Sequence, residues 1–215
     1  YCFILYAAYY ALGKKRNPLT ILASLLLLWL LVTGYLAFDG FFQNFDSIPP
    51  RLFLFVLPAI LIVLFLVITP STRKNLMKMP ITSLTYIHIV RIPVELCLWW
   101  LFGAGLVAGS MTFEGVNFDI LAGISAPFAG VFLVGKKSSN KITAILWNLI
   151  CLGLVLHIVI RAISLTPYFY DGSGEELQNL AVFYFPFVWL PAFVVPAVIF
   201  SHLVSLVQLM RKSDS

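Results

Sequence analysis

The sequence predicts an all-α protein: a polytopic transmembrane helix bundle of six complete spans plus a partial N-terminal seventh, forming a single domain over residues 1–215. Three observations lead to this prediction. Of the 215 residues, 61% are hydrophobic and only 11% are charged, against about 25% charged in an ordinary soluble domain. The apolar residues gather in runs of membrane-spanning length, and basic residues occupy alternate connections between these runs. This composition excludes a soluble globular domain, a disordered tail and a disulfide-stapled secreted scaffold.

A bilayer core of about 30 Å needs about 20 mostly apolar residues per helix. The six predicted spans cover residues 19–38, 52–68, 84–108, 120–134, 142–163 and 180–209. The apolar run 1–12 is too short to span alone, and we interpret it as part of a helix whose beginning is absent. The alternative is the end of a signal peptide, but no small-residue cleavage pattern is evident and the bases at 14–16 follow the apolar run.

Charged residues predict the orientation of these spans. Cytoplasmic loops of membrane proteins collect Lys and Arg. Alternate connections hold Lys14, Lys15, Arg16, Arg73, Lys74, Lys78, Lys136, Lys137, Lys141, Arg211 and Lys212. The other connections hold Asp39, Asp46, Glu114, Asp119, Asp171, Glu175 and Glu176, with Arg51 as their only base. We therefore expect the N-terminus outside and the C-terminus inside a membrane, most simply the bacterial cytoplasmic membrane.

The net charge of +5 does not indicate nucleic-acid binding, because the bases are divided among short loops and form no stripe with interleaved aromatics. The cysteines lie in apolar runs and suggest neither a disulfide framework nor a metal site. Motifs of common hydrolases, nucleotide-binding loops and zinc enzymes are absent. We expect the lipid bilayer as the partner of this chain and expect no cofactor.

Two packing features stand out. Gly105 and Gly109 form a GxxxG pair at the outer end of the predicted span 84–108, which would let a neighbouring helix or another membrane protein approach closely. Pro186, Pro191 and Pro196 punctuate the last predicted span and favour kinks there.

Ionisable residues within a membrane span are costly and mark candidate functional sites. His88, Arg91 and Glu95 share one helical face, and His157 and Arg161 share another. The depth of each residue follows from its distance along the helix, at 1.5 Å per residue from the nearest inner base. On this measure Glu95, His157 and Arg161 lie at about 24–30 Å. Asp119, at the mouth of the short span 120–134, lies at a similar depth, so the four residues could meet in the outer half of the bilayer.

Two interpretations of this group remain open. It is either a buried polar site that binds a small ligand or relays protons, with Glu95 as the titrating or cation-binding group and Arg161 as its partner. Or it is a structural Glu95–Arg161 pair that holds helices together, while Arg91 extends toward the inner surface.

A second level, at about 14–15 Å, holds His88 and His202. Two histidines at one depth are weak candidates for axial ligands of a haem b. A capped or interfacial histidine is the simpler interpretation, and we expect no stoichiometric haem.

Three segments resemble uncharacterised bacterial multi-pass membrane proteins: residues 111–127 (MTFEGVNFDILAGISAP), 91–95 (RIPVE) and 184–191 (YFPFVWLP). The resemblance implies a multi-pass membrane fold and transfers no catalytic residue. Function is thus predicted only by class. The leading hypothesis is a bundle that handles a small ligand, protons or ions, and the alternatives are a non-catalytic membrane subunit and a haem-binding protein.

Overall fold

A computed structural model describes residues 1–135, 140–174 and 176–211. Within these residues every regular element is a helix, which confirms the all-α class. Four of the charged residues that predict the orientation lie outside the described residues: Lys136, Lys137, Glu175 and Lys212.

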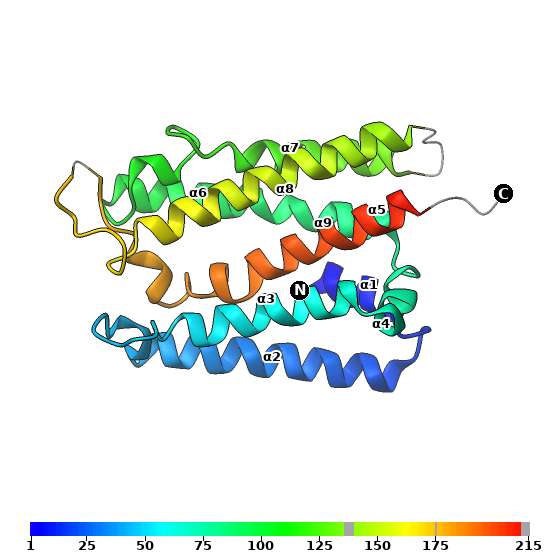
Figure 1. Ribbon diagram of the computed structural model, residues 1–215, viewed down its shortest axis with the longest axis horizontal. Helices are drawn as coiled ribbons and strands as arrows, with labels where there is room; N and C mark the ends of the chain where they lie inside the picture. The colour runs from blue at the N-terminus through cyan, green and yellow to red at the C-terminus, as the bar shows by residue number, and fades with distance from the viewer. Residues whose placement is uncertain (136–139, 175, 212–215) are drawn as a thin grey trace.

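The first half of the chain forms α1 (Cys2–Ala11), α2 (Arg16–Phe38), α3 (Phe53–Ile68) and α4 (Pro70–Leu76), with a short 3-10 turn at Phe41–Gln43. The α1 helix covers only part of the bundle length. The N-terminus, just before this helix, lies about midway along the bundle (Figure 1). The α3 and α4 helices meet at an angle of 86°. Pro70 begins α4, where it lacks the N–H that would continue α3.

The middle of the chain forms one long helical segment from α5 (Ile81–Ile87) through the 3-10 turn η2 (His88–Val90) to α6 (Arg91–Gly103). After the turn η3 (Gly109–Met111), the shorter α7 (Asp119–Phe128) continues into a π-helical segment, η4 (Ala129–Leu133).

The last part forms α8 (Lys141–Ser164), the turn η5 (Ala181–Phe183), the π-helical segment η6 (Leu190–Val194) and α9 (Val195–Met210). The side chain of Asn140 caps α8 by accepting a hydrogen bond from the Thr143 amide at 3.1 Å. Helix α9 is central, because it packs against α8, α5 and α3.

Four helical segments of the described chain are long and apolar enough to cross a membrane: α2, 81–103, α8 and 190–210. The bent pair of α3 and α4 gives a fifth if it counts as one span. The prediction of six complete spans is therefore too high. The run 120–134 is a shorter helix, and residues 180–189 form turns instead of the first third of the last span.

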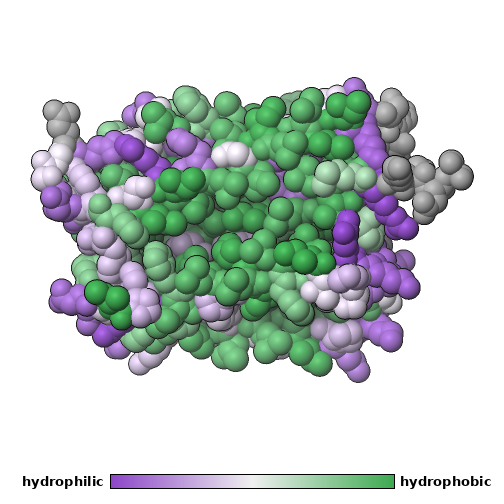
Figure 2. Space-filling view, in the orientation of Figure 1, coloured by the Kyte–Doolittle hydropathy of each residue, from purple (hydrophilic) through white to green (hydrophobic). Residues whose placement is uncertain are grey.

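The surface has an apolar middle and polar ends, as Figure 2 shows. The helices run along the long axis of the bundle, so the connections gather at its two ends (Figure 1). The loops around 12–15 and 69–80 lie at the same end as Lys141, which donates to the Arg211 carbonyl at 2.8 Å. We call this the basic end. The acidic connections 39–52, 104–118, 165–174 and 176–180 form the opposite end.

Two reciprocal hydrogen bonds attach the largely exposed α2 helix to the rest of the bundle. The Trp29 indole donates to the Ala192 carbonyl in η6, and the Trp189 indole donates to the Leu30 carbonyl in α2, both at 3.0 Å. A π-helical segment leaves carbonyls available for such bonds. Gly34 allows the close approach, because a Cβ there would lie 3.3 Å from the Trp189 ring.

Candidate functional site

Arg91 is the centre of a buried polar cluster. Its side chain is almost fully enclosed. One terminal nitrogen, Nη1, donates to Asp119 Oδ1 at 2.8 Å and to the Cys151 carbonyl at 3.0 Å, and the other, Nη2, contacts His202 Nε2 at 2.8 Å. The first residue of α6 thus joins the start of α7, the middle of α8 and the middle of α9. A charge in this position is tolerable because it is paired and hydrogen-bonded.

These contacts determine the tautomer of His202. A guanidinium has donors and no acceptors, so His202 Nε2 must accept from Arg91. Asn148 Nδ2 donates to the Ala144 carbonyl, so its Oδ1 is the acceptor at 3.0 Å from His202 Nδ1. His202 Nδ1 therefore carries the proton, and the ring is neutral.

His88 is fully buried and stacks on His202, with ring centroids 3.8 Å apart and planes 17° apart. Neither ring nitrogen of His88 has a hydrogen-bond partner. Axial ligands of a haem would direct nitrogens at an iron from opposite sides of the porphyrin. Here the ring faces are in contact and both His202 nitrogens are engaged, so the pair does not fit a haem. The described residues also contain no group of three or more His, Cys, Asp or Glu side chains that could hold a metal ion.

Glu95 lies two turns of helix beyond His88 and is also buried. Its Oε1 accepts from Asn117 Nδ2 at 2.5 Å, and its Oε2 has no partner. Asn117 also donates to the Met111 carbonyl and accepts from the Asp119 backbone amide. One amide side chain thereby bonds both the Glu95 carboxylate and the backbone of Asp119, whose own carboxylate pairs with Arg91.

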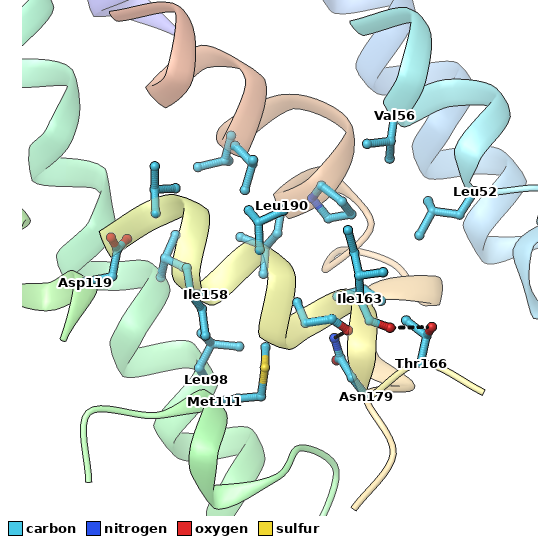
Figure 3. A pocket seen from close by; sticks show the side chains of 18 of the residues that line it. Leu52, Val56, Leu98, Met111, Asp119, Ile158, Ile163, Thr166, Asn179 and Leu190 are labelled. Carbon is cyan, nitrogen blue, oxygen red and sulfur yellow. Dashed lines mark hydrogen bonds between the residues drawn. The ribbon is translucent and has the colours of Figure 1, made fainter. Parts of the chain in front are cut away.

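The three ionisable residues Arg91, Glu95 and Asp119 contribute to the lining of a cavity of about 140 Å³ between α3, α6, α8 and η6–α9. Apolar side chains form most of its wall, including Val56, Leu98, Ile158 and Leu190 (Figure 3). Asp119 lies at one end of the view, and Thr166 and Asn179 lie at the other. Asn179 donates to the Ala162 carbonyl, and its Oδ1 is buried without a partner.

Arg161 and His157 do not join this cluster. Arg161 donates to Glu176 at 2.5 Å and 2.6 Å and to Ser110 at 3.1 Å, near the surface of the acidic end. His157 lies on the exposed face of α8. The expected Glu95–Arg161 pair is therefore wrong. The two residues were expected at similar depth, but Glu95 lies on the buried side of α6, whereas Arg161 lies on α8 near the surface. Arg91, expected to extend toward the inner surface, is instead the buried partner of Asp119.

The GxxxG pair is also not a helical motif. Helix α6 ends at Gly103, Gly105 adopts the left-handed conformation at φ +72°, and Gly109 begins η3. Gly105 thus turns the chain out of the helix instead of offering a flat helical face.

Sequence reasoning missed Asn117 and Asn148, which orient Glu95 and His202. Both had a recognisable signal. Asn148 is a lone amide within an apolar run, and such polar groups in spans usually bond to a neighbouring helix. Asn117 stands two residues before Asp119, where an Asx turn to its amide is common.

The fold and this cluster define an all-helical protein with membrane-compatible apolar helices around a buried, charged centre. Residues 48–210 match the model of a family described as a domain of unknown function, DUF8737, and the chain belongs to that family. The matched range contains Arg91, Glu95, Asn117, Asp119, Asn148 and both stacked histidines. No curated protein and no solved structure matches the chain.

Proposed function

We propose that this protein is a multi-pass membrane protein that binds an elongated, mostly apolar small molecule carrying a hydrogen-bond-donating or cationic end. The binding site is the cavity between α3, α6, α8 and η6–α9. The basic end of the bundle faces the cytoplasm, and the membrane is the bacterial cytoplasmic membrane. The positive-inside rule and the separation of basic and acidic loops support this placement.

The single observation that carries the proposal is the unpartnered Oε2 of Glu95 at the wall of an apolar cavity. A buried acceptor without a partner costs about 1–3 kcal/mol, more when charged, so a ligand donor there recovers free energy. The apolar wall accepts a hydrocarbon body, as small-molecule sites commonly do. Asn179 Oδ1, also buried without a partner, provides a second acceptor at the cavity wall.

The charge of the site predicts which head group is accepted. Arg91 is already engaged by Asp119, the Cys151 carbonyl and His202, whereas Glu95 has only the neutral Asn117 donor. A primary alkylamine presents three donors to Glu95, whereas a fatty acid presents a like charge. We therefore expect alkylamines to bind in preference to fatty acids of equal chain length.

Binding is tested by thermal unfolding of the protein in nanodiscs with alkylamines, alcohols and carboxylic acids of matched length. A ligand that binds only the folded state raises Tm in a saturable way. We expect a saturable increase with the amine and none with the acid. Glu95→Gln should remove the preference for the amine, and Asp46→Asn, at an exposed carboxylate of the acidic end, should preserve it.

If no member of the series raises Tm in a saturable way, the ligand-binding proposal is wrong. An amine effect of equal size in Glu95→Gln would show that the amine binds elsewhere, for example at the bilayer surface.

A further inference from the structure

The unpartnered buried polar atoms of the described residues are not scattered through the bundle. They belong to Ser205, His88, Arg91, Glu95 and Asn179. Arg91, Glu95 and Asn179 line the cavity, whereas His88 and Ser205 are fully buried and are not part of its lining. We call Ser205, His88, Arg91 and Glu95 the polar column.

Helix geometry gives the column its direction. His88, Arg91 and Glu95 occupy positions i, i+3 and i+7, so they share one face over about 10 Å of helix. On α9, Ser205 lies one turn beyond His202, whose ring stacks on His88. One further turn leads to Gln208, which donates to the Leu76 and Met79 carbonyls at the basic end. The column therefore connects the cavity at Glu95 with the basic end.

Buried polar groups without partners are costly, so a hydrogen-bonding guest beside them would recover free energy. Buried water is the usual partner of such groups, with about three hydrogen bonds per molecule. We infer that internal water occupies the polar column and that the column conducts protons between the cavity and the basic end, with His88 as the relay. This inference concerns an activity separate from ligand binding.

His88 has the chemistry that a relay needs. A neutral imidazole has one nitrogen that donates and one that accepts. A proton arriving from water on one side bonds to the accepting nitrogen, and the proton on the other nitrogen leaves to water on the opposite side. The ring charge is unchanged overall, and a flip of the ring about its Cβ–Cγ bond restores the starting state without returning the proton.

The groups around His88 favour concerted transfer over a stored positive charge. Arg91 from α6 is paired with Asp119 from α7, so their charges offset. His202 from α9 is neutral and both of its nitrogens are engaged, which excludes it from the relay. From α8, Trp147 contacts the edge of the stack and contributes no charge. Glu95 is the nearest acid without a cationic partner of its own.

Proton flux is measured in liposomes containing the purified protein and a trapped pH dye, with a potassium gradient and valinomycin to impose a potential. We expect faster acidification than in protein-free liposomes. His88→Phe keeps an aromatic ring in the stack and removes both nitrogens, so its flux should fall to the protein-free level. Ser205→Ala removes one hydroxyl of the column with little change in volume, and its flux should also fall.

The matched control is His157→Phe, the same substitution on the exposed face of α8, which should retain the wild-type flux. Wild-type flux equal to that of protein-free liposomes would overturn the inference. Wild-type flux in both Ser205→Ala and a folded His88→Phe protein would also overturn it. So would a loss of flux in His157→Phe as large as the loss in His88→Phe. Alkylamine binding, measured on the same samples, shows separately whether the cavity proposal holds.

Discussion

Arg91 and Asp119, 28 residues apart in the chain, form an ion pair of 2.8 Å in which both side chains are almost completely enclosed, at 2% and 7% exposure. This pair, and not the expected one between Glu95 and Arg161, is the charged connection at the centre of the bundle. Arg91 also contacts His202, and Asn117 joins the Asp119 backbone to Glu95.

Breaking this pair from one side should be costly. Asp119→Asn leaves the Arg91 guanidinium buried without a compensating charge, so we expect a loss of about 3–5 kcal/mol in the free energy of unfolding. The double change Arg91→Gln with Asp119→Asn should recover part of this loss, because no unpaired charge remains. Denaturant titrations in detergent measure both. Strictly additive losses would show that the two groups do not interact.

The exposed pair provides the comparison. Arg161 and Glu176 are each about 36% exposed, so water screens their attraction. Removing either partner should cost about 0–1 kcal/mol. A loss as large as that of Asp119→Asn would contradict the assignment of Arg161 to the surface of the acidic end.

Asn117 should be important for stability despite its neutral side chain. Asn117→Ala removes the donor to Glu95 and the acceptor for the Asp119 amide, so buried polar groups lose their partners. We expect a cost of about 1–3 kcal/mol. Asn44→Ala, in an exposed turn, is the control and should change stability by less than about 0.5 kcal/mol. Equal effects of the two substitutions would contradict the role given to Asn117.

The attachment of α2 is tested through its tryptophans. Trp29→Phe and Trp189→Phe each remove one indole donor while keeping an aromatic ring, and each should cost about 0.5–1.5 kcal/mol. Gly34→Val should also be destabilising, because its side chain meets the Trp189 ring. Trp100→Phe, at a largely exposed tryptophan of α6, should be nearly neutral. Thermal unfolding of the four variants in nanodiscs ranks these effects.

The orientation of the bundle is tested by labelling cysteines in intact cells. In a background with Cys2, Cys97 and Cys151 replaced by serine or alanine, Ser71→Cys reports on the basic end and Ser173→Cys on the acidic end. We expect a membrane-impermeant maleimide to label Ser173→Cys only, because basic loops stay in the cytoplasm. Labelling of Ser71→Cys alone would reverse the orientation.

The sequence by itself determined the helical class and most helix positions, because a chain this apolar must satisfy its backbone hydrogen bonds within helices. The spacing of His88, Arg91 and Glu95 placed them on one face, and the depth count placed His88 and His202 at one level, where the structure shows their rings stacked. These features depend only on helical rise and turn, which are the same in every α-helix.

Only the tertiary structure decided which face of each helix turns inward. In α8 apolar residues surround the whole helix, so its periodicity does not distinguish the side of Asn148 and Cys151 from the side of His157. Depth alone therefore paired Arg161 with the wrong acid. Helix ends were also undetermined, because the turns at Gly105 and before Leu190 interrupt runs whose hydrophobicity continues. Rotation of a uniformly apolar helix costs little in lipid, so contacts between helices, and not composition, fix the site.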